Sequence, residues 1–293
     1  MQQNDFGKTG LRVSALGFGA GQIGAESLDD AAAGRLLNAG LDCGITLIDT
    51  ARGYGLSEER IGRHLGHRRS EFVLSTKVGY GIAGYADWTY GCIIAGIDEA
   101  LARLRTDVID IVHLHSCPLE ILTAGEVIAA LTHAREQGKV RVAAYSGENT
   151  ELAWAVQSGH FGSVECSVNL FDQGSLNTVL PSAATSGMGI IAKRPLGNAP
   201  WRHAQRPTGD YCEPYWQRMQ ALSLNTLGLP WDAFALRFSA FAPGICSAIA
   251  GTASLAHLRH NVALVEAGRL KPDTVEEIMR RYREIGGEWT GQI

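Results

Sequence analysis

The feature that most constrains the fold of this chain is a regular alternation of short apolar runs with longer amphipathic segments. The apolar runs are rich in Val and Ile, and Gly or a polar residue often follows them, as is typical of buried strands. We expect eight such strands, over residues 15–20, 45–49, 72–77, 108–115, 140–146, 163–169, 188–193 and 246–251. Helix-like segments with apolar residues at helical spacing lie between them, at 29–43, 89–105, 124–139, 150–159, 175–187 and 254–268.

Repeated strand–helix units imply parallel strands joined by right-handed crossovers. Eight units in 293 residues predict an α/β fold, a closed (β/α)8 TIM barrel. Residues 4–19 predict an N-terminal hairpin that closes the bottom of the barrel, and residues 216–241 predict extra helices before the last strand. Residues 194–215 form a long loop, of the kind that is often functional. Without repeats or linkers, residues 1–293 are expected to be a single domain.

Composition excludes several classes of protein. The formal charge is -4 and the pI is about 6.1, which argues against binding to nucleic acid or to an anionic membrane. No apolar stretch has the roughly 18 residues of a membrane span, and the polar N-terminus does not resemble a signal peptide. The six cysteines have no C-x-x-C or zinc spacing, so we expect small buried side chains and no metal site. A cytoplasmic protein is expected.

Four polar side chains are predicted to meet at one rim. The active sites of (β/α)8 barrels lie at the carboxyl ends of the strands, where Asp49, Lys77 and His115 each end a predicted strand and Tyr54 follows Asp49 on a glycine-rich bend. Each has a structural alternative when taken alone. Asp49 can cap a turn, Tyr54 can pack in a loop, Lys77 can be a solvated charge, and either His115 or the neighbouring His113 can be a core histidine. Their joint placement favours a catalytic site.

Several motifs resemble those of the aldo-keto reductase superfamily. They include "GKTGLRVSALGFG", "IDTARGYGLSEERIG", "LSTKVG", "DVIDIVHLHS", "SVN", "RPLGNA" and "GTASLAHLRHNV", which together span nearly the whole chain. The second is the most specific, because an Asp-Thr-Ala with a Tyr five residues after the Asp is the signature of the family. The resemblance implies a catalytic tetrad of Asp49, Tyr54, Lys77 and His115.

The chemistry of these residue types fits that role. Carbonyl reduction needs a hydride, which a nicotinamide supplies, and a proton from a general acid. We expect the ammonium of Lys77 to lower the pKa of Tyr54 from about 10 towards about 7, a shift worth roughly 4 kcal/mol. Asp49 would hold Lys77, and His115 would donate to the substrate oxygen. In reverse, Tyr54 would take the proton of an alcohol.

The resemblance also implies NADP or NAD, bound across the mouth of the barrel without a Rossmann motif. Gly19 would line the site. Ser146 would meet the carboxamide of the nicotinamide. Gly147 stands where the family usually has Asn, and Glu165 where it usually has Gln. Lys193 stands where many members stack a Tyr on the nicotinamide. The phosphates and adenosine would contact Pro195, Leu196, Gly197, Gly251, Thr252, Ser254, His257 and Asn261. Since only His257 and Arg259 offer charge for a 2′-phosphate, the choice between NADP and NAD stays open.

The expected partner is a small molecule. Candidates for the substrate pocket are Trp88, Tyr90, Cys117, Trp201, Tyr211 and Tyr215. No Arg or Lys cluster suggests a carboxylate or phosphate clamp, which favours a neutral aldehyde, ketone or sugar. The protein would be a monomer or small homo-oligomer. The alternatives are a nucleotide-binding redox-sensing or regulatory subunit with little turnover, and a barrel enzyme of another class with Lys77 as a Schiff-base lysine.

Overall fold

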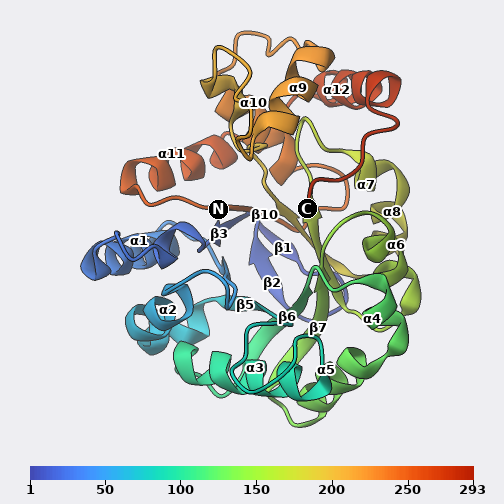
Figure 1. Ribbon diagram of the computed structural model, residues 1–293. Helices are drawn as coiled ribbons and strands as arrows, with labels where there is room; N and C mark the ends of the chain where they lie inside the picture. The colour runs from blue at the N-terminus through green and yellow to red at the C-terminus, as the bar shows by residue number, and fades with distance from the viewer.

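The computed structural model describes residues 1–293 and contains a closed barrel of eight parallel strands (Figure 1). Their order around the barrel is β10-β3-β4-β5-β6-β7-β8-β9. The strands are β3 (Leu16–Gly19), β4 (Leu47–Asp49), β5 (Val73–Val78), β6 (Ile109–His115), β7 (Val140–Ser146), β8 (Ser163–Ser167), β9 (Gly189–Lys193) and β10 (Ser247–Ala250). The predicted (β/α)8 fold is thus confirmed, and every strand lies within or one residue from its predicted range.

Helices surround the barrel, as the alternating pattern predicts. They are α1 (Asp30–Asp42), α2 (Ser57–Leu65), α3 (Tyr90–Leu104), α4 (Leu119–Ala124), α5 (Glu126–Glu136), α6 (Asn149–Ser158), α7 (Gly174–Thr178), α8 (Leu180–Ser186), α9 (Glu213–Leu222), α10 (Trp231–Ala240), α11 (Leu255–Glu266) and α12 (Pro272–Ile285), with short 3-10 turns η1 (Gln22–Gly24), η2 (Gly66–Glu71) and η3 (Pro200–Arg202). Two predictions were incomplete. The segment at 124–139 is α5 preceded by α4, because Gly125 (φ 81°) breaks the helix, and residues 175–187 divide at Val179 into α7 and α8.

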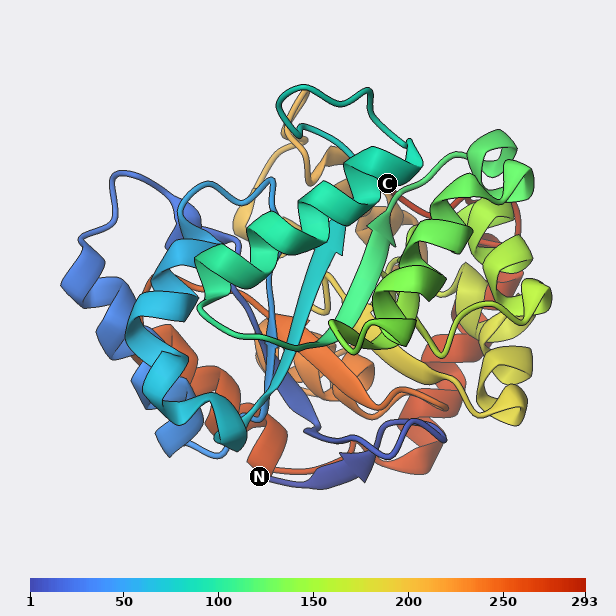
Figure 2. The ribbon, with the colours of Figure 1, turned by 90° about the horizontal axis from the view of Figure 1, so that it is seen from below.

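The N-terminal hairpin lies at the end of the barrel where the strands begin (Figure 2). It consists of β1 (Gln3–Asp5) and β2 (Arg12–Ser14), paired antiparallel, as predicted. Directly after β1, Phe6 is fully buried against Gly189, where an added Cβ would lie 2.4 Å from the ring. Phe6 belongs to an apolar cluster of 11 residues that also includes Val13, Leu47 and Ile111. The lower half of the barrel is therefore a packed apolar core.

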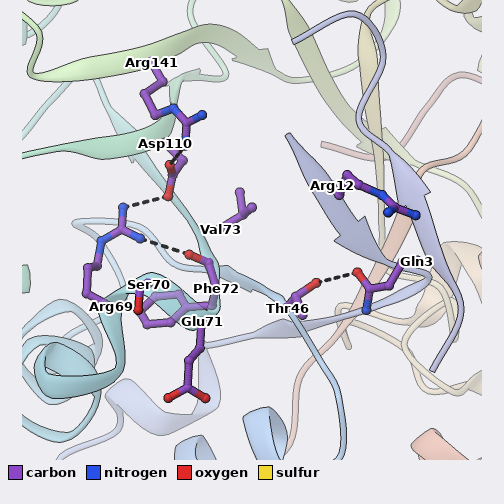
Figure 3. Close-up of a pocket in the computed structure, with 10 residues that line it drawn as sticks. All are labelled: Gln3, Arg12, Thr46, Arg69, Ser70, Glu71, Phe72, Val73, Asp110 and Arg141. Carbon is purple, nitrogen blue, oxygen red and sulfur yellow. Dashed lines mark hydrogen bonds and ion pairs between the residues drawn. The ribbon is translucent and has the colours of Figure 1, made fainter. Parts of the chain in front are cut away.

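A polar pocket lies beside the hairpin, at this lower end (Figure 3). Its central feature is the buried carboxylate of Asp110, which accepts hydrogen bonds from Arg69 at 2.6 Å and from Arg141 at 2.8 Å. Thr46 donates to Gln3 at 3.0 Å and so connects the barrel to the hairpin. These contacts join β6, β7, η2 and the hairpin, and their role is structural.

A larger apolar cluster of 64 buried residues lies between the barrel and the helices. After α12 the chain runs back to the end of the barrel to which the strands point, so the C-terminus lies near the rim opposite the hairpin (Figure 2). None of the helices combines the length and the apolar character that crossing a membrane requires. The rim is therefore formed by the loops that follow the strands and by the C-terminal segment.

Candidate active site

The predicted lysine–carboxylate pair is present at the upper end of the barrel. The Nζ atom of Lys77, on β5, lies 2.5 Å from Oδ2 of Asp49, at the end of β4. The two strands pair so that Asp49 stands opposite Ser75, and Ser75 donates a hydrogen bond of 2.7 Å to Oδ1 of Asp49. Both oxygens of Asp49 are thus satisfied and its position is fixed.

A second carboxylate contacts the same ammonium. Oε1 of Glu165, on β8, lies 3.4 Å from Nζ of Lys77, and Lys77 also donates to the carbonyl of Thr50 at 3.0 Å. Burial alone would lower the pKa of Lys77, but the two carboxylates outweigh burial and raise it. The ammonium therefore stays charged, and it is a poor Schiff-base nucleophile.

Tyr54 lies on the bend between β4 and α2, as the sequence predicts. The space around its backbone is so tight that a Cβ on Gly24 would lie 1.6 Å from its carbonyl oxygen. The bend is anchored below by Ser57, which donates to the carbonyl of Ala20 at 2.8 Å and accepts from the hydroxyl of Thr50 at 2.7 Å. Nζ of Lys77 lies 5.3 Å from the centroid of the Tyr54 ring. The glycine-rich bend therefore holds the phenol beside the ammonium.

The expected acidification of Tyr54 is wrong. Lys77 acts to lower the pKa of Tyr54, but burial and the charges of Asp49 and Glu165 together raise it above its ordinary value. Glu165 is a second carboxylate beside Lys77, and its charge was not part of the expectation for Tyr54. Tyr54 is accordingly a protonated phenol, ready to donate.

His115, at the end of β6, completes the group. Its ring lies edge-on to Tyr54, with centroids 6.2 Å apart. Nδ1 is 2.8 Å from the hydroxyl of Tyr80, and the rings of Tyr80 and His115 stack at 5.6 Å. Burial and the charge of Lys77 lower the pKa of His115 to about 3. The imidazole is therefore neutral, and when Tyr80 donates to Nδ1 the proton on Nε2 is free for a ligand.

His113, two residues earlier, also points into the barrel and is completely buried. Its Nε2 lies 3.1 Å from the hydroxyl of Ser75 and 3.8 Å from Glu165. On the strand between them, β7, the residue paired with His113 is the small Ala144, which leaves room for this approach. Burial lowers the pKa of His113 to about 4, so it is a neutral core histidine and His115 is the rim histidine.

The residues expected at the nicotinamide lie on neighbouring strand ends. Ser146 pairs in register with His115 on one side and with Glu165 on the other, and its hydroxyl donates to Oε1 of Glu165 at 3.2 Å. Oε2 of Glu165 is buried without a hydrogen-bond partner. The nicotinamide carboxamide carries N–H donors that would satisfy it, so this part of the site fits the group. A Cβ at Gly147 would lie 2.4 Å from the hydroxyl of Tyr145, so the Asn that the resemblance implies at this position would not fit unless Tyr145 moved.

The loop after β9 has the backbone of a phosphate-binding segment. Four of its residues, Arg194, Gly197, Asn198 and Ala199, have positive φ between 53° and 60°, and strained backbone of this kind gathers at ligand sites. Pro195 and Gly197 are buried and Leu196 is half-buried. Lys193, expected to cover the nicotinamide, pairs instead through Nζ with Glu148 at 3.2 Å. Its aliphatic stem remains the part that could contact the ring.

The expected adenosine end is formed by β10 and the start of α11. Gly251 lies against Gly19 and Gln22, and a Cβ on it would be 2.0 Å from Oε1 of Gln22. Two side chains here already accept hydrogen bonds from the backbone: Thr252 from the N–H of Ser254 at 3.0 Å, and Ser254 from the N–H of His257 at 3.4 Å. Asn261 is buried, whereas His257 and Arg259 are exposed. Ser254 thus acts as the N-cap of α11, and Arg259 forms no ion pair.

Four of the predicted pocket aromatics differ in their exposure and in what they contact. Trp88 lies over Gly79, where a Cβ would be 2.1 Å from the indole, and its ring is 5.8 Å from that of Tyr80. Trp88 therefore stands beside the tetrad. Tyr90 and Tyr211 are exposed, and Trp201 stacks on Trp231 at 5.9 Å.

The other two candidates were wrong. Tyr215 is buried and donates to Asp172 at 3.0 Å, so it supports the loop from below. Cys117 is completely buried in the main core, and burial raises the pKa of its thiol to about 12. It neither borders the pocket nor has the character of a redox-active thiol.

Two parts of the site were missed from the sequence. Tyr80 is only three residues after Lys77, so its position on the rim was a usable signal. The C-terminal segment offered no motif: Gln292 donates its backbone N–H to Asp172 at 3.0 Å, Gly291 donates to Asn149 at 2.8 Å, and the carbonyl of Gln292 accepts from Arg194. This segment joins α6, the loop before α7 and the loop after β9 at the rim.

Comparisons with known proteins agree with this geometry. A model described as the aldo/keto reductase family matches residues 15–282. An L-galactose dehydrogenase from Arabidopsis thaliana is 28% identical over 294 residues, covering 93% of this chain and 91% of the relative. A probable voltage-gated potassium channel subunit beta from Oryza sativa subsp. japonica is 32% identical over 213 residues, covering 68% of this chain and 65% of the relative.

A solved structure is similar over almost its whole length. The holo form of an aldo-keto reductase from Bacillus halodurans superposes with a TM-score of 0.82 at 25% identity, covering 96% of each chain. The similarity therefore extends over nearly the whole of both chains.

Proposed function

Since the chain belongs to the aldo/keto reductase family, and is thus an oxidoreductase, we propose that it uses a nicotinamide cofactor to interconvert a carbonyl and an alcohol. The substrate class that we favour is a neutral, hydroxyl-rich molecule such as a sugar. The observation that carries the proposal is the buried ammonium of Lys77, held at 2.5 Å by Asp49 and 5.3 Å from the ring of Tyr54.

The roles of the side chains follow from their charges. When bound, the cofactor supplies or accepts the hydride. In reduction, the hydroxyl of Tyr54 gives its proton to the substrate oxygen, and Lys77 stabilises the phenolate that remains. Asp49 holds Lys77 charged and in place. In oxidation, Tyr54 first releases its own proton to solvent and then takes the hydroxyl proton of the substrate.

His115 stabilises the oxygen on which charge develops. With Tyr80 donating to Nδ1, its Nε2–H is the donor, and a neutral donor in a buried site is worth more than one in water. The low pKa of His115 also prevents it from competing with Tyr54 as the acid. Trp88 provides an apolar wall beside these groups, of the sort that packs against the C–H faces of a sugar.

The residues fit a nicotinamide nucleotide and leave the choice of nucleotide open. Ser146 and Glu165 would hold the carboxamide, and Pro195, Leu196 and Gly197 would approach the phosphates. Arg259 is exposed and without an ion-pair partner, and it could meet a 2′-phosphate, but no second cation is fixed beside it. We therefore expect NAD and NADP to differ less in affinity than at a site with a bidentate arginine clamp.

The test is a titration of intrinsic tryptophan fluorescence with NADH and NADPH, followed by a turnover panel with the preferred nucleotide. The panel contains simple aldehydes and ketones for reduction and free aldoses for oxidation. We expect saturable binding of at least one nucleotide and turnover of at least one neutral substrate. If neither NADH nor NADPH binds, the proposal is contradicted.

A second function is supported by the similarity to a channel subunit. A redox-sensing or regulatory protein would bind the nucleotide at the same site and turn over slowly. Binding of NADH or NADPH with no turnover across the whole panel would favour this function. The complete tetrad favours the enzyme.

A further inference from the structure

The upper end of the barrel contains one more carboxylate than it contains cations. Asp49 and Glu165 both lie within ion-pair distance of Lys77, at 2.5 and 3.4 Å. All three side chains are only 1% exposed, so water does not screen the difference. When both carboxylates are ionised, a surplus of one negative charge therefore lies inside the barrel beneath the rim.

The other ionisable groups that face this cluster do not cancel the surplus. Burial keeps His113 and His115, on β6, neutral because it lowers their pKa values to about 4 and about 3. Lys193, on β9, is paired with Glu148 at 3.2 Å. The phenols of Tyr54 and Tyr80 have pKa values raised above the ordinary value and carry no charge.

Glu165 is the carboxylate with an oxygen that accepts no hydrogen bond. Its Oε1 accepts from Ser146 and lies near Lys77, whereas Oε2 is buried and has no hydrogen-bond partner. Asp49, in contrast, has both oxygens occupied, by Lys77 and Ser75. An unpartnered buried carboxylate oxygen is costly, and it points to a ligand that brings a donor or a positive charge to this position.

Resting on the proposed function, we infer that Glu165 makes the site discriminate between the two redox states of the nicotinamide, binding the cationic oxidised ring more tightly than the neutral reduced ring. The oxidised and reduced forms differ by one unit of charge on the ring, and a buried carboxylate senses that charge strongly. When both redox forms compete, the site would therefore be occupied mainly by the oxidised nucleotide, the form that an alcohol substrate would reduce.

The chemistry of the favoured direction balances. The oxidised nicotinamide, held by Ser146 and Glu165, would accept a hydride, which is two electrons and one proton, from the carbinol carbon of the substrate. Because Tyr54 is protonated at rest, it must first release its own proton to solvent. It would then take the hydroxyl proton, and the substrate would become a carbonyl compound, or a lactone when the carbon is the anomeric carbon of a sugar. The oxidant is the nicotinamide itself, so no other co-reactant is needed.

The experiment compares nucleotide affinities in three proteins: wild type, Glu165→Gln and Glu58→Gln. Glu58 is a matched control because it is a buried carboxylate bonded to Thr76, next to Lys77 on β5, but paired with Arg103 outside the barrel. The dissociation constants of the oxidised and reduced forms of the preferred nucleotide are measured by calorimetry. The measurements are made above the pKa of Asp49, which burial and Glu165 raise to about 7.

Glu165→Gln should weaken binding of the oxidised form by about tenfold, and it should change binding of the reduced form by less than about twofold. Glu58→Gln should not weaken binding of the oxidised form in this way. An equal change for both redox states, or no change, would overturn the inference. If wild type binds neither form, the proposed function itself fails.

A second measurement uses wild type alone, so it does not depend on the folding of a variant. The surplus charge is complete only when Asp49 and Glu165 are both ionised. Affinity for the oxidised form should therefore rise as pH rises through the pKa of Asp49, while affinity for the reduced form stays constant. Parallel pH dependence for the two forms would contradict the role of the surplus charge.

Discussion

The two ends of the barrel contain ion clusters of opposite composition. At the upper end one cation, Lys77, lies between two carboxylates. At the lower end one carboxylate, Asp110, lies between Arg69 and Arg141 at 2.6 and 2.8 Å. The lower arginine side chains are 25% and 51% exposed, whereas the upper lysine is 1% exposed.

This difference in exposure decides what each cluster can do. Water and salt screen the lower cluster, so its surplus positive charge has little effect beyond joining neighbouring elements. The upper cluster has no such screening, and its surplus negative charge acts on whatever binds at the rim. The apolar cluster that includes Phe6 and Ile111 separates the two ends.

The largest contrast is expected from removing the central residue of each cluster. Lys77→Met leaves two buried carboxylates without their cation, and it should cost roughly 3–5 kcal/mol of the free energy of unfolding and about 10³-fold in turnover. The stranded carboxyls would have raised pKa values in the folded state, so the folded protein binds more protons and the variant loses stability as pH rises. Urea denaturation at several pH values measures this.

The matched control at the lower end is Asp110→Asn. Because Arg69 and Arg141 can be solvated, the loss should be nearer 1 kcal/mol, with nucleotide binding and turnover unchanged. Equal losses of stability in the two variants would show that burial does not distinguish the two clusters.

A smaller effect concerns the pH dependence of reduction. Tyr54 must be protonated to donate, and its pKa lies above the ordinary tyrosine value, so the single-turnover rate should stay constant as pH rises through the ordinary range. In Glu165→Gln one of the charges that raises this pKa is removed, and the decline should begin at lower pH. Stopped-flow rates over a pH series measure both profiles, and coincident profiles would exclude an effect of Glu165 on Tyr54.

The smallest effect is expected for Tyr80→Phe, which removes the hydroxyl 2.8 Å from His115. A neutral hydrogen bond of this kind is worth about 0.5–1.5 kcal/mol, so kcat should fall about three- to tenfold without a change in KM. Tyr90→Phe, at the exposed start of α3, is the control and should leave kcat and KM unchanged. A change in KM with constant kcat would instead place Tyr80 in substrate binding.

The sequence was sufficient for the barrel because alternating apolar and amphipathic segments have few other compact arrangements. It was also sufficient to bring Asp49, Tyr54, Lys77 and His115 together, since each follows or ends a strand. It was not sufficient for the direction of the pKa shift of Tyr54, because Glu165 reaches Lys77 across the barrel from a strand more than 80 residues later. The prediction that Cys117 and Tyr215 line the substrate pocket was wrong, because proximity in sequence does not give the direction of a side chain.

The central claim is that the phenol of Tyr54 exchanges the proton with the substrate oxygen. Its most direct test is the single-turnover rate of hydride transfer in Tyr54→Phe saturated with the preferred reduced nucleotide, compared with wild type. We predict a loss of roughly 10²–10⁴-fold with an unchanged dissociation constant for the nucleotide. Hydride transfer at the wild-type rate in that variant would contradict the account.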